Sequence, residues 1–261
     1  MKKKIALITG INGQDGSYLA KFLLEKGFIV YGLSRRTSNY KFQRLKYLRI
    51  FDKIKIIYGD IVEFEYFSKI IKNIKPDMLF NLAAQSFVDY SFDNKFTTFE
   101  INNKAVYNIL ETIKNFSTKT KFYQASTSEM YGNSKKKSQN ENTEFNPISP
   151  YAVSKVSAHD LVRIYRNSFG LFACSGILFN HESPLRGPEF VTKKIISGLI
   201  RIKYKNGKPL ELGNLYSKRD WGYVEDYVSA IFKIINHSSP EDFVVGTSVS
   251  KSILEFFKLS C

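Results

Sequence analysis

The sequence predicts an α/β fold in which a doubly wound parallel sheet is joined to a smaller second lobe. Short apolar runs alternate with longer segments of helical periodicity, which is typical of crossover units that place helices on both faces of a parallel sheet. A glycine-rich turn follows the first apolar run directly, and beyond residue 180 the chain becomes richer in proline and glycine. A length of 261 residues is sufficient for one large core and a smaller lobe.

The individual elements follow from two hydrophobic periods. Short apolar runs predict strands over residues 5–9, 28–33, 54–58, 78–83, 121–125 and 172–179. Patterns with a helical period predict helices over residues 17–26, 64–74, 98–114 and 151–169. In the remainder we expect helices over 192–205, 224–236 and 250–259 and a strand over 243–245. We therefore expect a nucleotide-binding domain made of residues 1–180 and 224–247, and a partial substrate-binding lobe made of 181–223 and 248–261.

Composition narrows the class of protein. The net charge of +15 permits a nucleic-acid or anionic membrane partner, but the lysines are spread along the chain instead of gathering on one element. No apolar run is long enough to span a bilayer, and the run after the basic N-terminus is interrupted at once by Gly10 and Asn12, which is unlike a signal peptide. Two cysteines cannot form a disulfide framework. We expect a cytoplasmic protein with no nucleic-acid partner, no membrane partner and no metal site.

The glycine-rich turn carries the first functional signal. The predicted strand 5–9 leads straight into Gly10, Gly13 and Gly16, and a helical pattern follows. Such glycines permit a tight turn, a close backbone approach to a pyrophosphate and close packing of helix on strand, and the helix N-terminus then favours an anion. An ordinary glycine-rich turn is the alternative, but the strand–loop–helix context favours a Rossmann-type dinucleotide site. The predicted contacts are Gly10, Asn12, Gly13, Gln14, Asp15 and Gly16.

Further predicted cofactor contacts lie where the next strands end. An acidic residue commonly follows the second strand when the cofactor is NAD, whereas this chain has Arg35 and Arg36, which suit the 2′-phosphate of NADP. A pair of solvated surface arginines is the alternative. Asp60 is placed to meet the adenine edge, and small residues after the fourth strand leave room for the cofactor. This second set comprises Asp60, Ile61, Leu82, Ala83 and Ala84.

A tyrosine and a lysine one helical turn apart carry the second signal. Tyr151 and Lys155 lie on one face of a helix that Ser149 can cap and that Pro150 suits at its first position. A free tyrosine has a pKa of about 10, and a nearby ammonium group and a positive nicotinamide both favour its phenolate. Such a tyrosine can take a proton from an alcohol while hydride leaves for the cofactor. A chance pair on an exposed helix is the alternative, which the preceding nucleotide loop disfavours.

Two further polar residues follow the fifth strand. Thr127 and Glu129 are two positions apart and share a face if the strand continues through them. The Thr127 hydroxyl could bind the oxygen being oxidised. A carboxylate at Glu129 suggests a second proton transfer, such as removal of a C–H proton beside a new ketone. From spacing alone, the favoured interpretation of Glu129 is an ordinary acid at the start of a loop or helix.

These motifs together resemble the extended short-chain dehydrogenase/reductase superfamily, and several longer strings resemble its GDP-mannose 4,6-dehydratase family. The matching strings are Ile8–Gly10 with Gly13–Leu19, Arg35-Arg36, Asn81–Ser86, Tyr123–Glu129, Ser149–Ala152, Gly176–Pro184, Phe190–Thr192, Leu212–Asn214 and Lys218–Gly222. Together they span most of the chain. The family usually has arginine where this chain has Leu185, and its members extend further at the C-terminal end.

The resemblance implies a role for each matching residue. Tyr151 would deprotonate the hydroxyl at sugar carbon 4, Lys155 would tune Tyr151 and bind the nicotinamide ribose, and Thr127 would bind the same sugar oxygen. Glu129 would then remove the proton at carbon 5 and assist loss of water from carbon 6. The remaining implied contacts are Ser86, His181 and Arg186 to NADP, and Ser86, Asn180, Lys194 and Arg219 to the substrate.

The resemblance therefore implies an NADP-dependent hydro-lyase that acts on GDP-mannose, feeds GDP-deoxyhexose synthesis such as that of GDP-fucose, and forms a homo-oligomer, either a dimer or a tetramer. Two alternatives remain open at this point. One is a nucleotide-sugar epimerase or decarboxylase of the same superfamily. The other is a shortened, non-catalytic protein that binds NADP or another subunit.

Overall fold

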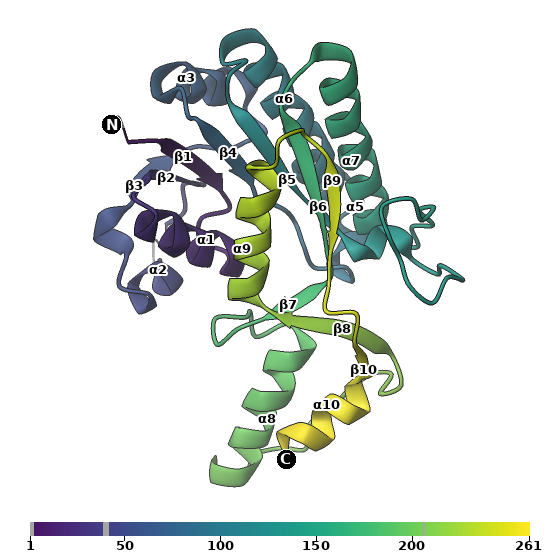
Figure 1. Ribbon diagram of the computed structural model, residues 1–261. Helices are drawn as coiled ribbons and strands as arrows, with labels where there is room; N and C mark the ends of the chain where they lie inside the picture. The colour runs from purple at the N-terminus through teal and green to yellow at the C-terminus, as the bar shows by residue number, and fades with distance from the viewer. Residues whose placement is uncertain (1–2, 39–41, 206) are drawn as a thin grey trace.

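A seven-stranded, fully parallel sheet forms the centre of the protein in the computed structural model, which describes residues 3–38, 42–205 and 207–261. The strand order is β3-β2-β1-β4-β5-β6-β9, so the chain winds outward in both directions from β1 (Figure 1). The strands are β1 (Ile5–Thr9), β2 (Ile29–Ser34), β3 (Lys55–Tyr58), β4 (Met78–Asn81), β5 (Lys121–Thr127), β6 (Ala173–Leu178) and β9 (Asp242–Val245). The prediction of a doubly wound parallel sheet is confirmed.

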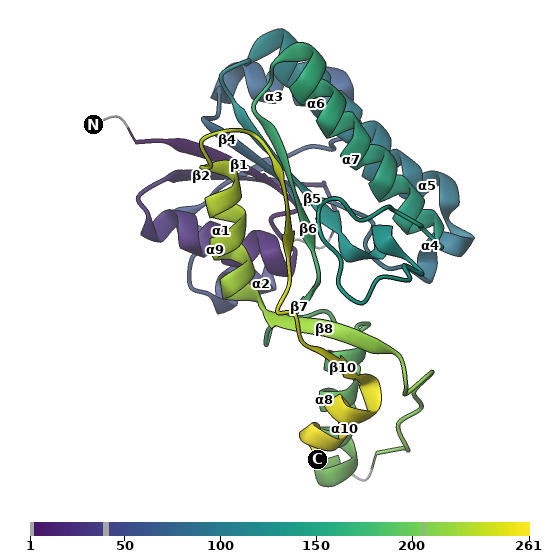
Figure 2. The same ribbon diagram turned by 45° about the vertical axis from the view of Figure 1, so that its right-hand side comes forward.

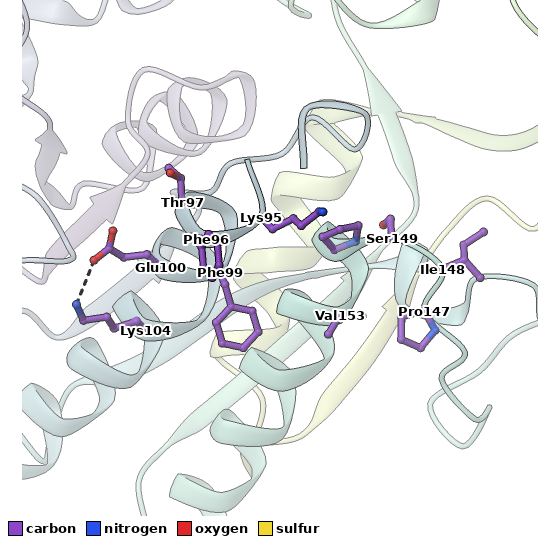
Figure 3. A pocket seen from close by; sticks show the side chains of 11 residues that line it. Lys95, Phe96, Thr97, Phe99, Glu100, Lys104, Pro147, Ile148, Ser149 and Val153 are labelled. Carbon is purple, nitrogen blue, oxygen red and sulfur yellow. Dashed lines mark hydrogen bonds and ion pairs between the residues drawn. The ribbon is translucent and has the colours of Figure 1, made fainter. Parts of the chain in front are cut away.

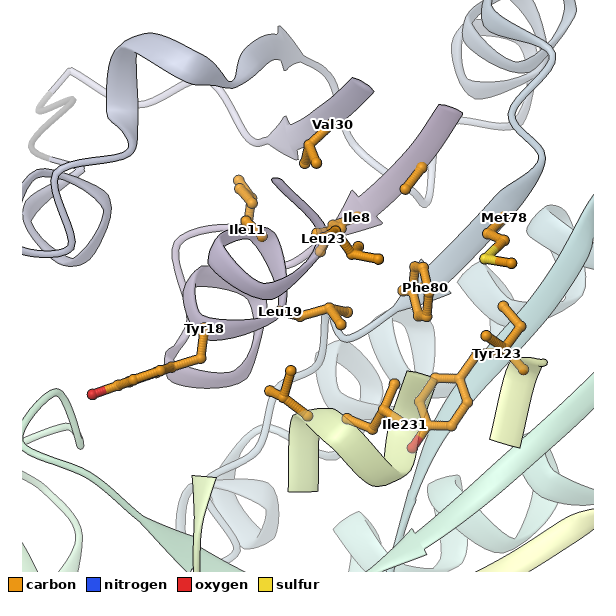
Figure 4. Close-up of a cluster of buried hydrophobic side chains, with 14 of the residues drawn as sticks. Ile8, Ile11, Tyr18, Leu19, Leu23, Val30, Met78, Phe80, Tyr123 and Ile231 are labelled. Atoms are coloured by element: carbon orange, nitrogen blue, oxygen red, sulfur yellow. The ribbon is translucent and has the colours of Figure 1, made fainter. Parts of the chain in front are cut away.

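Helices cover both faces of this sheet and bury two separate apolar clusters. On one face, α1 (Gln14–Glu25) and α9 (Val224–Ile235) bury side chains such as Leu19, Leu23 and Ile231 against the strands (Figure 4). On the other face, α3 (Phe64–Ile74), α6 (Ala105–Phe116) and α7 (Pro150–Phe169) enclose the second cluster. Shorter helical elements are α2 (Gln43–Tyr47), α4 (Tyr90–Asp93), α5 (Lys95–Phe99), a π-helical segment (Glu100–Lys104) and 3₁₀ turns at Phe51–Lys53 and Ser128–Tyr131.

A second, smaller sheet starts immediately after β6, at the carboxyl end of the central sheet (Figure 2). Its middle strand β8 (Lys218–Tyr223) pairs in parallel with β7 (Asn180–Glu182) and antiparallel with β10 (Ser250–Ser252). The same lobe contains α8 (Val191–Lys205) and α10 (Ile253–Ser260). No helix in the described part of the chain is long and apolar enough to cross a membrane.

The helices and strands that differ from the prediction lie in segments where hydrophobic periodicity is weak. The strands β7, β8 and β10 and the helix α2 were not predicted, because short polar segments show neither period and pairing with neighbouring strands determines their conformation. The helix predicted over 98–114 is interrupted by the π-helical segment, and α1 begins at Gln14 instead of residue 17. The strand predicted over 78–83 ends at Asn81.

The turn from β1 into α1 depends on two glycines that have no room for a side chain. Gly10 has a φ of +73°, and a Cβ there would lie 2.7 Å from the backbone nitrogen of Ala83. A Cβ at Gly16 would overlap the carbonyl oxygen of Gly10. The absence of a side chain at these positions therefore lets α1 start close behind β1 and beside the end of β4.

Replacing Gly16 tests this packing, because Gly16 lies within α1. In an open helix, alanine would be more stable than glycine by about 0.5–1 kcal/mol. Here we expect Gly16→Ala to lower the free energy of unfolding by about 1–3 kcal/mol, since the new methyl group meets backbone that cannot move away. Chemical denaturation measures this, with Gly213→Ala as the control because a Cβ at Gly213 meets open space. Equal stability of Gly16→Ala and the unchanged chain would contradict the close packing.

Candidate active site

A cleft of about 590 Å³ lies at the carboxyl ends of the central strands, between the large sheet and the second lobe. This edge of a parallel sheet is where ligands bind in open α/β folds. Seventeen of the residues predicted from the sequence line this one cleft: Gly10, Gly13, Gln14, Asp15, Gly16, Leu82, Ala84, Ser86, Thr127, Glu129, Tyr151, Lys155, Asn180, His181, Arg186, Lys194 and Arg219.

Six predicted cofactor contacts lie outside the lining of this cleft: Asn12, Arg35, Arg36, Asp60, Ile61 and Ala83. Arg35 and Arg36 are exposed directly beyond β2. The Asp60 carboxylate accepts the backbone N–H of Val62 at 3.1 Å and so caps its own turn. Ile61 is 5% exposed and its side chain packs in the core, so a cofactor contact at this position would involve its backbone.

The first turn of α1 forms the wall of the cleft beside β1. Gly13 precedes the helix in an extended conformation and has no side chain with which to cap it. Gln14, Asp15 and Gly16 follow and line the cleft. The N–H groups and the positive dipole end of this turn favour an anionic group, as in a dinucleotide pyrophosphate site.

Tyr151 and Lys155 reach the cleft from the first turns of α7. Ser149 caps this helix by accepting the Ala152 N–H at 3.1 Å, and Pro150 occupies its first position. Tyr151 is 7% exposed and Lys155 is 4% exposed. The Lys155 ammonium donates to the Ala125 carbonyl at 2.9 Å, and its Nζ lies 5.9 Å from the centre of the Tyr151 ring. The local cap and the contact with β5 therefore fix both side chains.

Burial dominates the protonation of this pair. Burial, with a smaller contribution from the Glu129 charge, raises the pKa of Tyr151 to about 12, although the nearby Thr127 hydroxyl lowers it. Burial likewise lowers the pKa of Lys155 to about 8. The phenol pKa is thus above its usual value, and the pKa of the Lys155 ammonium group is below its usual value.

Thr127 and Glu129 approach Tyr151 by a different route from the one predicted. The strand β5 ends at Thr127 and a 3₁₀ turn begins, so the strand conformation does not continue to Glu129. The Thr127 hydroxyl caps this turn by accepting the Glu129 N–H at 3.2 Å. Both side chains nevertheless line the cleft together with Tyr151, because the turn folds Glu129 back toward it. The condition for a shared strand face is therefore not met, and the 3₁₀ turn brings Glu129 to the cleft instead.

The cleft also includes residues that the sequence did not single out. Arg44 of α2 donates to the Asn12 carbonyl at 2.9 Å and to the Leu185 carbonyl at 2.8 Å, and so joins the glycine loop to the second lobe. It lies in a helix of five residues with no recognisable motif, so no sequence signal could have identified it. The others are Phe87, Val88, Asp89, Ala125, Ser126, Leu178, Phe179, Gly187, Glu189, Phe190, Val191, Leu212 and Gly213.

Two predicted cofactor contacts are engaged with protein groups. The His181 Nε2 atom lies 2.9 Å from an Asp15 carboxylate oxygen, and its Nδ1 atom lies 2.8 Å from the Phe179 carbonyl oxygen. Arg186 forms an ion pair with Glu182 at 3.2 Å. Both of these charged side chains therefore join elements around the cleft. Among the described residues, no group of three or more His, Cys, Asp or Glu side chains is placed to bind a metal ion.

A separate groove of about 980 Å³ lies on the outer surface of α5 and α7 (Figure 3). Its walls are mainly apolar and include Phe99, Ile148 and Val153. Phe96 also lines it and is 92% exposed. None of the polar residues of the cleft lies in this groove, so the two hollows are different surfaces of the protein.

Solved structures share the fold. A dTDP-glucose 4,6-dehydratase from Bacillus anthracis in complex with NAD superimposes with a TM-score of 0.85 at 24% identity, covering 98% of this chain and 79% of that one. A UDP-glucose 4-epimerase from Thermotoga maritima with UDP-glucose gives a TM-score of 0.88 at 25% identity, covering 98% of this chain and 81% of that one. At this identity the likeness establishes the fold, which is common to dehydratases and epimerases.

Sequence comparison is more specific. A GDP-mannose 4,6-dehydratase from Vibrio cholerae is 45% identical over all of this chain and 72% of its own length. The GDP-mannose 4,6-dehydratases of Drosophila melanogaster and Homo sapiens are 45% and 43% identical, over 67% and 72% of their lengths and 98% and 99% of this chain. The family model described as GDP-mannose 4,6 dehydratase matches residues 7–261. This chain belongs to the GDP-mannose 4,6-dehydratase family.

Proposed function

We propose that this protein is a hydro-lyase that converts GDP-mannose to GDP-4-keto-6-deoxymannose and water. One observation carries the proposal beyond family membership: Thr127, Glu129 and Tyr151 share a single cleft with the glycine loop. A hydroxyl, a carboxylate and a phenol beside a dinucleotide site are the groups that oxidation followed by elimination requires. A simple alcohol dehydrogenase needs no carboxylate in the position of Glu129.

The cleft fits a nicotinamide dinucleotide. The uncapped first turn of α1 suits its pyrophosphate, and the absence of side chains at Gly10 and Gly13 leaves backbone exposed along this wall. Lys155 lies deep in the same cleft, where it would bind the nicotinamide ribose. When bound, the oxidised dinucleotide supplies a hydride acceptor that is regenerated within each turnover, together with a positive charge that favours the Tyr151 phenolate.

The chain's own residues then move two protons. Tyr151 takes the proton of the carbon-4 hydroxyl, while the Thr127 hydroxyl hydrogen bonds to the same oxygen. Oxidation at carbon 4 acidifies the adjacent C–H bond, and Glu129 accepts the carbon-5 proton. Glu129 then returns that proton to the carbon-6 hydroxyl as it leaves as water. The hydride taken from carbon 4 would return to carbon 6, and the proton held by Tyr151 would be released to carbon 5, which gives the 6-deoxy ketone and restores both side chains. Glu129 is partly buried beside Tyr151, so one carboxylate can serve both transfers.

The nucleotide sugar enters from the side of the second lobe. Lys194 and Arg219 line the cleft from α8 and β8, where their charges suit a diphosphate. Asn180 and Ser86 line it from β7 and the loop after β4 and would contact the sugar. We assign dinucleotide binding to residues 1–180 and 224–247 and nucleotide-sugar binding to 181–223 and 248–261.

Replacing the carboxylate separates oxidation from elimination. We expect Glu129→Gln to bind the dinucleotide as the unchanged chain does and to lose about 10²–10⁴-fold in dehydration rate, because the amide cannot accept the carbon-5 proton. Mass spectrometry of the product from GDP-mannose measures the loss of one water. Glu144→Gln, at an exposed position outside the cleft, is the matched control. If Glu129→Gln dehydrates the substrate at the rate of the control, Glu129 is not the group that accepts the carbon-5 proton. If the unmodified chain gives a product with the same mass as GDP-mannose, an epimerase is favoured.

We further propose NADP as the cofactor, on the basis of two exposed arginines beyond β2. Charge-assisted contacts to a 2′-phosphate predict that the double change Arg35→Ala and Arg36→Ala weakens NADP⁺ binding about 10- to 100-fold. The affinity for NAD⁺, which has no such phosphate, should stay within about threefold by the same principle. Isothermal titration calorimetry measures both, with Arg163→Ala on the exposed face of α7 as control. An equal loss of affinity for NADP⁺ and for NAD⁺ would contradict the proposal.

We also propose that the protein forms a homo-oligomer through the groove on α5 and α7. Phe96 projects beside an apolar hollow on the same face (Figure 3), so the surface can complement a copy of itself about a twofold axis. Lys95, Lys104 and Glu100 also line the groove and provide charges of both signs. A second hollow along α7, which includes Val156 and Leu161, extends the apolar strip. These features support a second copy of this chain as the occupant of the groove.

Placing a charge at Phe96 should dissociate this assembly. We expect Phe96→Asp to shift the molecular mass in sedimentation or light-scattering measurements from the oligomer to a smaller species, because the new carboxylate would be buried in the interface. The thermal stability of the monomer should change little, since Phe96 is 92% exposed. Tyr216→Asp, at a position 78% exposed in the second lobe, is the control. An unchanged mass for Phe96→Asp would exclude this face as the interface.

A further inference from the structure

An acidic residue stands where the proposed function needs an anion site. Asp15 belongs to the first turn of α1 and lines the cleft, and 25% of its side chain remains exposed. A helix N-terminus favours a carboxylate, but an uncompensated carboxylate would also repel the pyrophosphate that the same turn is proposed to bind. The site therefore requires a compensating positive charge close to Asp15.

His181 is the group that provides it. Its Nε2 atom lies 2.9 Å from the Asp15 carboxylate, and its Nδ1 atom lies 2.8 Å from the Phe179 carbonyl oxygen. Both ring nitrogens lie close to oxygen atoms, and Nε2 forms no aligned hydrogen bond, so the contact with Asp15 is an ion pair in which the protonated ring supplies the positive charge. The ring is 7% exposed and stacks on Tyr227 of α9 at a centroid distance of 4.3 Å. This stacking fixes the orientation of the imidazolium toward Asp15.

Neighbouring hydrogen bonds hold His181 in this position. Gln14, next to Asp15, donates to the His181 carbonyl at 3.1 Å and accepts the Ser183 hydroxyl at 2.7 Å. Gln14 also donates to the Asp15 carboxylate at 3.2 Å. Two residues of α1 are thus bound to β7 and the residue that follows it, so the pair lies at a junction between the large sheet and the second lobe.

We propose that His181 is a positioning residue whose charge neutralises Asp15 and so allows the first turn of α1 to accept a dinucleotide pyrophosphate. This inference rests on the proposed function, and it replaces the expectation that the His181 side chain contacts the cofactor directly. The Asp15–His181 pair then has two effects. It fastens the second lobe to the nucleotide loop, and it removes a negative charge from the anion site.

The electrostatic surroundings agree with a charged histidine. Burial alone would lower the pKa of His181, but the Asp15 charge and its hydrogen bond outweigh burial and raise it above its usual value, against an opposing effect of Arg186. Burial would raise the pKa of Asp15, yet His181, with help from Gln14 and Arg186, brings it down to about 2. Burial raises the pKa of Glu182, the neighbour of His181 in β7, against the opposing charges of Arg186 and His181.

The charge of Asp15 also extends across the cleft. It acts to raise the pKa of both Tyr151 and Lys155, although burial is the largest influence on each. Loss of the compensating imidazolium would therefore affect the reactive side of the cleft as well as the pyrophosphate site.

A double-mutant cycle on NADP⁺ affinity tests the proposal, with calorimetry as the readout. His181→Gln removes the positive charge and keeps an N–H donor toward Asp15, so we expect binding to weaken about 10- to 100-fold. In the Asp15→Asn background the same change should cost less than about threefold, because no carboxylate is left to neutralise. A purely structural role for His181 would instead give equal losses in both backgrounds and would overturn the proposal.

The single change Asp15→Asn provides a second test, which does not depend on whether the histidine variant folds. It removes the carboxylate and leaves His181 in place, so NADP⁺ should bind at least as tightly as to the unchanged chain. Weaker binding to a folded Asp15→Asn protein, with its folding verified by thermal unfolding, would contradict the charge argument. His181→Gln is likewise compared only after its unfolding transition has been measured.

The pH dependence provides a third readout. Because the pKa of His181 is raised, the imidazolium persists above pH 6.5 and is lost as the pH rises through the folded value. NADP⁺ affinity of the unchanged chain should therefore fall over that rise, and the profile of His181→Gln should lack this fall while keeping the titrations common to both proteins, such as that of Lys155 with a pKa of about 8. Identical pH profiles of NADP⁺ affinity for the unchanged chain and for His181→Gln would overturn this inference and leave the proposed function standing. Failure of the unchanged chain to bind NADP⁺ or NAD⁺ would overturn the proposed function and the inference together.

Discussion

The close approach of backbone to backbone at Gly10 and Gly16 is the constraint on which the site depends. A side chain at Gly10 would meet the backbone after β4, and one at Gly16 would meet the carbonyl of Gly10. Only with both positions bare can α1 start directly behind β1, with its first turn facing the edge where β4, β5 and β6 also end. The parallel register of the sheet then brings the first turn of α1, the first turns of α7 and the second lobe to one cleft.

The sequence predicted this arrangement best where hydrophobic periodicity, or the spacing of two functional side chains, identifies a helix or strand. The central strands and the main helices follow from apolar runs, and the Tyr151–Lys155 pair follows from helical spacing. Glu129 shows the limit of such reasoning. Its side chain reaches the cleft through a 3₁₀ turn capped by Thr127, and no strand pattern describes that turn. Arg44 shows a stricter limit, because its two carbonyl partners lie in distant segments and only the folded chain brings them together.

Burial in the cleft opposes the chemistry that the cleft is proposed to perform. It disfavours the charged forms of both Tyr151 and Lys155, raising one pKa to about 12 and lowering the other to about 8. At neutral pH the Tyr151 phenol is then uncharged, whereas Lys155 is still mostly protonated, so burial of the pair carries the desolvation cost of one charge. In the proposed reaction, the positive charge of an oxidised dinucleotide would offset the cost of forming the phenolate.

The second lobe is built from short polar strands, and hydrophobic burial contributes little to holding them in place. The strands β7, β8 and β10 are short and partly exposed, and they contribute little to either apolar cluster. They are fixed instead by polar contacts, as when the Asp220 carboxylate of β8 accepts the backbone N–H groups of Thr247 and Ser248 at 2.8 and 2.9 Å. Polar strands of this kind leave side chains such as Arg219 and Asn180 free to face the cleft. For the same reason they carry no hydrophobic period, so the lobe that would choose the substrate is also the part of the fold that sequence patterns describe least.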